Sequence, residues 1–167
     1  MTYVDEIKIP QHVLDDNSMH SILDWLLDTS IMLYLASDEI NDFFLLHGVS
    51  STWALNQIML NAFLGEKRKA VEILRLHVGV LLATYITQQA PNINEDNLSQ
   101  GTEVLVDISW LKIKSKLLDE IPKDSDDHVY KLVQICYETA RKSDHASKTE
   151  LLYKKAAMTV MGHAFRF

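Results

Sequence analysis

Apolar residues recur every three to four positions along most of the chain, and this spacing predicts helices rather than strands. The pattern predicts six helices, over about 18–36, 39–63, 67–89, 104–118, 126–142 and 148–162. No convincing strand pair, sequence repeat or low-complexity tract lies between them. We therefore expect residues 1–167 to form one all-α domain, an irregular helical bundle of about six helices.

Polar residues and helix breakers mark the ends of these segments. The candidate caps at the helix starts are Asn17 or Ser18, Asp38, one of Asp124, Ser125 and Asp126, and Ser147 or Lys148. Gly65 ends the second segment, and Pro91 ends the third because proline disfavours helix in the residue before it. The polar, turn-rich segment 92–107 predicts an exposed connection, although the apolar pattern resumes within it from residue 103.

The stretch "DFFLLHGVSSTWAL" (42–55) raises a question, because it places His47, Gly48, Ser50 and Ser51 inside a helical, apolar pattern. Helical spacing lets the histidine and the serines share one face, which would line a cavity. Glycine would then allow a ligand or another backbone to approach closely. The other interpretation is a hydrogen-bonded core histidine with glycine at a close helix crossing. Trp53 follows, and it either packs in the core or binds a ligand.

His128 and Lys131 lie three positions apart at the start of the fifth helix, so they are neighbours on its surface. Imidazole is a good metal ligand, whereas a lysine joins a metal site only after losing its charge, by deprotonation or by carbamylation. The plainer interpretation of "DDHVYK" is a capped helix start with a solvated lysine. His77 is likewise a ligand or a satisfied core histidine, and Arg75 could reach an anionic group.

Composition narrows the class of protein. The net charge of -7 argues against nucleic acid or an anionic membrane as the main partner. Cys136 is the only cysteine, which excludes an internal disulfide, favours a cytoplasmic location and predicts an inert core thiol. The longest apolar run, 78–87, is about half of the roughly 20 residues that span a bilayer, so we expect no membrane span. Generic nucleotide-binding and zinc-protease motifs are missing.

Four segments, read in order, resemble the questin oxidase-like family. They are "DFFLLHGVSSTWAL" (42–55), "KRKAVEILRLHVGVLLATYITQQAP" (67–91), "WLKIKSKLLDE" (110–120) and "DDHVYKLVQICYETA" (126–140). The family has a helical histidine motif followed by small residues, a long helix that runs into a proline turn, and an Asp-His-x-x-Lys segment before another helix. The resemblance covers about residues 30–142 and corresponds to the C-terminal portion of the family's members.

The resemblance implies an oxidoreductase of secondary metabolism that opens a ring of an aromatic polyketide, such as an anthraquinone, by Baeyer–Villiger-type oxidation. It implies molecular oxygen and NADPH as co-reactants and neither flavin nor haem. His47, His128 and Lys131 carry over as catalytic residues. They are also our candidate ligands for non-haem iron, because several imidazoles on one cation suit that metal. Gly48, Ser50, Ser51 and Trp53 would then bind the planar substrate beside His47.

Members of the family are typically more than twice as long as these 167 residues. The chain is accordingly expected to be a fragment, a diverged inactive relative, or one part of a two-chain enzyme whose partner completes the pocket. The alternative function is a noncatalytic helical module whose apolar surface binds another chain. Exposed core-type patches favour the module, whereas a buried cavity where His47, His128 and Lys131 converge favours the oxygenase.

Overall fold

The computed structural model describes residues 11, 19–39, 41–62, 67–122, 126–142 and 147–162. The α-helices in these ranges are α2 (Met19–Ala36), α3 (Phe43–Ala62), α4 (Lys67–Thr87), α5 (Asp96–Ser99), α6 (Trp110–Glu120), α7 (Asp127–Lys142) and α8 (Ser147–Gly162). A 3₁₀ helix, η2, spans Glu103–Leu105. No strand is present in the described residues, where Ser37 and Ile93 form an isolated antiparallel bridge. The all-α fold predicted from the sequence is confirmed.

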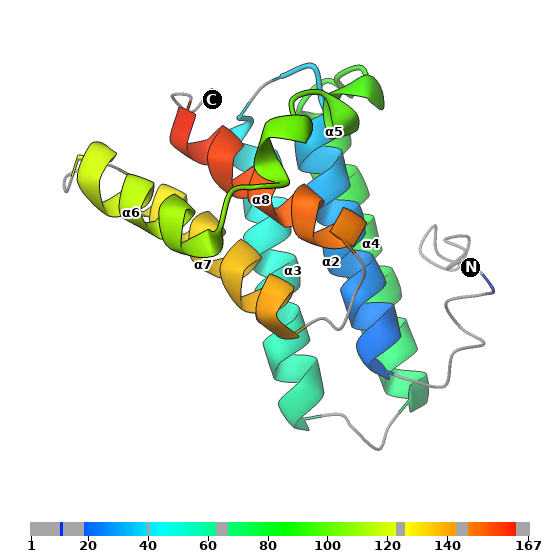
Figure 1. Ribbon diagram of the computed structural model, residues 1–167. Helices are drawn as coiled ribbons and strands as arrows, with labels where there is room; N and C mark the ends of the chain where they lie inside the picture. Colours follow the sequence, from blue (N-terminus) through cyan, green and yellow to red (C-terminus); the bar gives the residue numbers. More distant parts are fainter. Residues whose placement is uncertain are drawn as a thin grey trace.

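The helices form two packed groups that meet through α3 and α8 (Figure 1). The long helices α2, α3 and α4 lie side by side, with α2 in contact with both others. The helices α7 and α8 pack against each other, and α8 also contacts α2 and α6. Because α3 contacts α7 as well, side chains near the start of both helices can meet.

Two clusters of buried apolar side chains hold these groups together. The larger joins α2, α3, α6, α7 and α8 and includes Leu46, Val49, Leu132, Cys136 and Ala156. The smaller joins α2, α3 and α4 and includes Ile22, Leu26, Met59 and Leu74. The Cys136 side chain is fully buried, and burial raises the pKa of its thiol, as expected of an inert core cysteine.

Polar side chains set two helix starts later than the apolar pattern predicted. The helix α3 begins at Phe43 rather than near residue 39, because the Asp42 carboxylate accepts a hydrogen bond from the Leu45 N–H (2.8 Å). The prediction of a helix over 104–118 is wrong at its start, where η2 and a turn precede α6. Ser109 caps α6 by accepting a hydrogen bond from the Lys112 N–H (3.3 Å).

The connection after α4 is bound to the connection that precedes α3. Gln89 and Ala90 have positive φ angles of 63° and 47°, which end α4 at Thr87 rather than at the predicted residue 89. The Asp38 N–H then donates to the Asn92 carbonyl (3.0 Å). This contact fixes the loop that leads into α3, on which His47 lies.

The helix α4 is unusually exposed for an apolar helix. By length and composition its segment Lys69–Thr87 could cross a membrane, and 17% of that window is buried inside the structure. This corrects the expectation, based on the uninterrupted run 78–87, that no segment is long and apolar enough. A single helix of this kind is weak evidence for a membrane span, and Arg75 and His77 lie within it.

Candidate functional site: a histidine pair between α3 and α7

The structure brings His47 of α3 and His128 of α7 into direct contact. Their Nε2 atoms lie 3.0 Å apart, and the centroids of the two imidazole rings are separated by 4.6 Å. Both side chains are half-buried. Neither position is near the other in sequence, so this contact depends on the packing of α7 against α3.

A backbone carbonyl determines which nitrogen of His47 carries the hydrogen. The Nδ1 atom lies 2.8 Å from the carbonyl oxygen of Phe43, one turn earlier in α3. Because a carbonyl oxygen only accepts hydrogen bonds, Nδ1 must be the donor. In the neutral ring the lone pair of His47 is therefore on Nε2 and points toward His128.

The aromatic ring of Phe43 covers both imidazoles. Its centroid lies 4.3 Å from that of His47 and 4.9 Å from that of His128, with edge-to-face geometry in each case. Edge-to-face contacts of this kind stabilise ring orientation beyond the area that they bury. Phe43 therefore restricts the motion of the pair and covers part of its surface.

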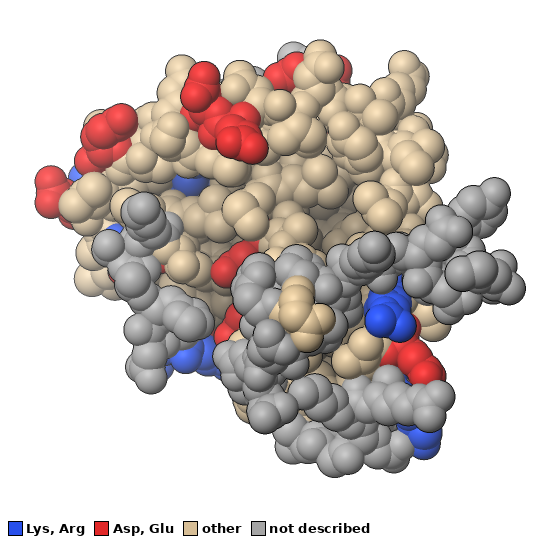
Figure 2. Space-filling model, turned by 90° about the vertical axis from the view of Figure 1, so that its right-hand side faces the viewer, with Lys and Arg blue, Asp and Glu red and all other residues tan. Residues whose placement is uncertain are grey.

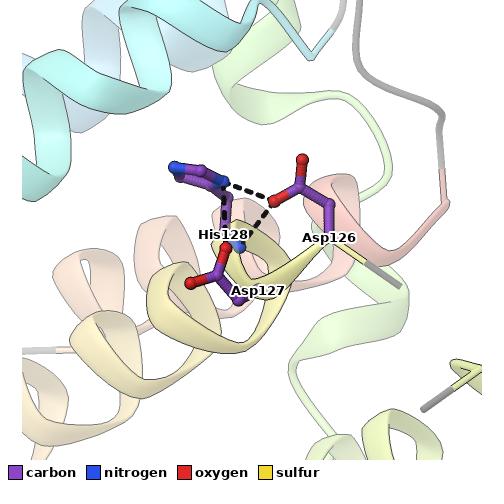
Figure 3. A group of neighbouring side chains, drawn as sticks. All are labelled: Asp126, Asp127 and His128. Carbon is purple, nitrogen blue, oxygen red and sulfur yellow. Dashed lines mark hydrogen bonds and ion pairs between the residues drawn. The ribbon is translucent and has the colours of Figure 1, made fainter. Parts of the chain in front are cut away.

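Two carboxylates surround the opposite edge of the His128 ring. Figure 3 shows Asp126 and Asp127 with oxygen atoms directed at Nδ1, while the other ring nitrogen faces away from both. Asp126 Oδ1 is hydrogen bonded to Nδ1, and Asp127 Oδ1 is 3.4 Å from it. Hydrogen bonds from His128 lower the pKa of Asp126. One ligand atom from each of the three residues lies within 4.8 Å of the others, a grouping that could hold a metal ion.

Lys131 is not brought to the histidine pair. Its ammonium group forms an ion pair with Asp127 (2.6 Å), and its side chain is 54% exposed. Hydrogen bonding from this ammonium lowers the pKa of Asp127. Lys131 thus lies on the solvent side of α7, as a charged residue on a capped helix start would.

Gly48 lies at a close helix crossing rather than beside an open cavity. A Cβ atom at this position would lie 3.0 Å from Leu81 Cδ2 of α4. This space is filled by Leu81, so the expectation that Gly48 makes room for a substrate beside His47 is replaced by a packing role.

The other residues expected at a substrate site make local contacts. The Ser50 hydroxyl donates to the His47 carbonyl (3.2 Å), and the Ser51 hydroxyl donates to the Gly48 carbonyl (3.0 Å). Ser51 is exposed, whereas Trp53 is half-buried and packs against the larger core cluster. Trp53 also borders a small cavity of about 90 Å³ between α2, α3 and α7.

His77 belongs to a separate polar contact inside the bundle. The Thr52 hydroxyl donates to the Gly48 carbonyl (2.7 Å) and accepts a hydrogen bond from His77 Nε2 (2.8 Å). Burial lowers the pKa of His77, because its charged form is poorly solvated there. His77 is thus a satisfied interior histidine.

Nearby on α4, the Nε atom of Arg75 is buried and has no hydrogen-bond partner.

Comparison with known proteins identifies the family. A family model described as Questin oxidase-like matches residues 1–136, a range that contains His47, His128 and Lys131. This chain belongs to the questin oxidase-like family. No curated protein and no solved structure matches the chain.

The match shows which helices belong to the questin oxidase-like region. It extends to residue 1, beyond the range of about 30–142 on which the resemblance was recognised, and so includes all of α2. It ends at residue 136, within α7. Both histidines of the pair, all of α3 and the first part of α7 therefore lie inside the family region.

Sequence analysis missed two residues of this candidate site. Phe43 was expected only as an apolar helix residue, and Asp126 only as a helix cap. The spacing of Phe43 and His47, one helical turn apart, was a signal for the ring contact. The contact between Asp126 and the His128 ring had a weaker signal in the sequence, because a cap residue two positions before a histidine is common at helix starts and does not by itself indicate a side-chain contact.

Proposed function

We propose that the protein is an oxygenase of the questin oxidase-like family and that His47 and His128 supply two ligands of a non-haem iron. The observation that carries the proposal is the 3.0 Å separation of their Nε2 atoms. Two nitrogen ligands at a right angle on one metal, each about 2.1 Å from it, are themselves roughly 3.0 Å apart. The distance between the two nitrogens thus matches two neighbouring positions of an octahedral metal.

The chemistry of the two rings supports the same proposal. The neutral His47 ring presents its Nε2 lone pair to His128. Two facing lone pairs repel unless a proton lies between them or both rings turn their lone pairs toward one cation beside them, and imidazole nitrogen is a suitable ligand for iron. The pair is therefore prepared to take up a cation.

Two imidazoles do not complete an iron site, so further ligands are part of the proposal. Lys131 is a poor candidate, because its ammonium is charged and bound to Asp127. It would have to lose its charge and leave that ion pair. Water or a second chain that completes the fold is the simpler source of the remaining ligands.

The family resemblance suggests the reaction. A Baeyer–Villiger-type oxidation inserts one atom of O₂ between a ring carbonyl carbon and its neighbour in an aromatic polyketide such as an anthraquinone. NADPH supplies a hydride, and solvent supplies a proton, so that the other oxygen atom leaves as water. Bound iron would supply a site for oxygen activation. The chain's own contribution is to hold both imidazoles in place and to cover them with Phe43.

The proposal is tested by oxygen consumption with NADPH and an anthraquinone. We expect His47→Ala and His128→Ala each to abolish consumption while circular dichroism shows unchanged helix content. His77→Gln is the matched control, since His77 is interior but contacts Thr52 instead of the pair. Consumption that persists in both alanine variants would disprove the catalytic assignment.

A second candidate function, a module that binds another chain, is supported by the exposed face of α4. Its large apolar side chains Leu76, Val80, Leu82 and Ile86 are 57%, 53%, 47% and 67% exposed. Figure 2 looks at the side with α2 and α4 and shows an uncharged area in the middle and right of the view above the grey atoms, with acidic residues along its upper and left margins. Soluble monomers seldom expose contiguous apolar areas of this kind. Under this proposal Val80→Lys dissociates a complex detected by analytical ultracentrifugation, whereas an unchanged sedimentation coefficient would count against it.

A further inference from the structure

One carboxylate oxygen makes two hydrogen bonds to the same histidine. Asp126 Oδ1 accepts from the backbone N–H of His128 (3.0 Å) and is also bonded to Nδ1 of its ring. The side chains of Asp126 and His128 are 36% and 20% exposed, so the contact is partly shielded from water. The bond from the backbone N–H fixes the position of the carboxylate. The bond to Nδ1 then orients the imidazole ring relative to the carboxylate.

We propose that Asp126 is a positioning residue that fixes the tautomer and the orientation of His128, so that its Nε2 atom faces His47. This inference concerns the same histidine pair as the proposed function and rests on it for its catalytic meaning. The carboxylate acts through His128 and itself contacts neither substrate nor iron in the proposed site.

The choice of tautomer decides whether His128 can bind a cation jointly with His47. A carboxylate accepts hydrogen bonds and donates none, so the hydrogen must be on Nδ1 of His128. The lone pair of the neutral ring is then on Nε2, the atom that lies 3.0 Å from His47 Nε2. Metal-binding histidines commonly donate their second ring nitrogen to a carboxylate in this way.

The neighbouring carboxylate of Asp127 does not serve the same purpose. Its Oδ1 is 3.4 Å from His128 Nδ1, beyond the range of a good hydrogen bond. Its Oδ2 is bound to the ammonium of Lys131 at 2.6 Å. Asp127 nevertheless places a second carboxylate near the ring, so Asp127→Asn removes a nearby negative charge and leaves the Asp126 contact in place.

Asp126 is also the cap of α7, and the variants must separate this role from positioning. Serine caps helices about as well as aspartate, because its hydroxyl can also accept a backbone N–H. Its hydroxyl oxygen is one bond closer to the backbone than Oδ1 of aspartate, so we expect it to accept the backbone N–H without reaching the ring nitrogen. Asparagine keeps an acceptor oxygen in the position of Oδ1 without the charge. Asp126→Ser therefore removes positioning and retains capping, and Asp126→Asn restores part of the positioning.

The first experiment measures the tautomer of His128 in the full chain without metal. Long-range ¹⁵N–¹H spectra at pH about 8.5, some two units above the ordinary imidazole pKa, report which nitrogen is protonated. We expect Nδ1–H in the wild type, in Asp126→Asn and in Asp127→Asn, and mainly Nε2–H in Asp126→Ser. An unchanged His128 tautomer in Asp126→Ser would overturn the proposal.

The second experiment titrates the same proteins with Co²⁺ as a spectroscopic probe for the metal. We expect Asp126→Ser to weaken binding by about 10- to 100-fold, Asp126→Asn by less, and Asp127→Asn only slightly. If Asp127→Asn weakens Co²⁺ binding as much as Asp126→Ser does, the loss of negative charge explains both results, and the proposal that Asp126 positions His128 is overturned. If the wild type binds no Co²⁺ while the tautomer still changes in Asp126→Ser, positioning is supported and the metal proposal fails.

Discussion

His47 and His128 lie with their Nε2 atoms 3.0 Å apart, although 81 positions separate them in the sequence. The contact unites the two histidine motifs on which the family resemblance was based. Each ring has its Nδ1 atom engaged by a different acceptor, the Phe43 carbonyl for His47 and the Asp126 carboxylate for His128. The two remaining nitrogens therefore face each other, which is the basis of the proposed iron site.

Replacement of Phe43 by leucine tests the role of the aromatic cover. Leucine keeps apolar bulk but loses the edge-to-face contacts with both imidazoles. We expect weaker Co²⁺ binding with little change in helix content. Phe44→Leu is the control, because Phe44 is next in sequence and 43% exposed. The same Co²⁺ affinity in wild type and Phe43→Leu would show that the ring does not hold the pair.

Substitution of Gly48 tests the close helix crossing. A leucine at this position would collide with Leu81, so we expect Gly48→Leu to lower the free energy of unfolding by about 1 to 3 kcal/mol. Urea unfolding measures this, with Ser51→Leu as the control on an exposed position three residues later. If Gly48→Leu is as stable as the wild type, the space beside Gly48 is open after all.

Because the pKa of His77 is lowered in the folded state, we expect the stability of the protein to depend on pH. Because burial lowers its pKa in the folded state below 6.5, the unfolded state takes up a proton first as the pH falls. The free energy of unfolding should therefore decrease as the pH falls from about 7 toward the lowered pKa of His77 in the folded state. His77→Gln keeps an N–H donor for Thr52 but does not titrate, so its stability should decline less. Identical pH profiles from thermal unfolding would contradict this.

The hydroxyl of Tyr153 on α8 contacts Asp28 on α2, so we expect its removal to lower the stability of the fold. Tyr153 is 1% exposed, and its hydroxyl donates a hydrogen bond to Asp28. We expect Tyr153→Phe to reduce the free energy of unfolding by about 1.5 to 3 kcal/mol, as for hydrogen bonds to charged groups. Tyr130→Phe is the control, since its hydroxyl bonds the Pro122 carbonyl at an exposed position. Similar losses in both variants would show that burial of the Asp28 contact adds nothing.

Much of the fold follows from apolar periodicity in the sequence. The segments predicted over 18–36, 126–142 and 148–162 agree with α2, α7 and α8 to within one residue at each end. The segment predicted over 104–118 failed at its start, because Val104 and Leu105 continue an apolar pattern whose helical start is set by the Ser109 hydroxyl. Periodicity reports which face is apolar and is silent about which polar side chain caps a helix.

The candidate site could be predicted only in part. His47 and His128 were identified by family resemblance, whereas their contact depends on how α3 packs against α7. A solvated Lys131 was one of two interpretations of its segment, and the ion pair with Asp127 on an exposed side chain agrees with it. Gly48 allowed two interpretations until Leu81 of α4 was placed beside it. Local spacing cannot reveal such contacts between distant segments.

The most direct test of the proposed iron site is the metal content of the purified 167-residue chain, measured by elemental analysis beside His128→Ala and His77→Gln. We predict near-stoichiometric iron in the wild type and in His77→Gln, and its loss in His128→Ala. A wild-type chain without iron after incubation with Fe²⁺, or iron retained in His128→Ala, would contradict the assignment of the histidine pair as an iron site.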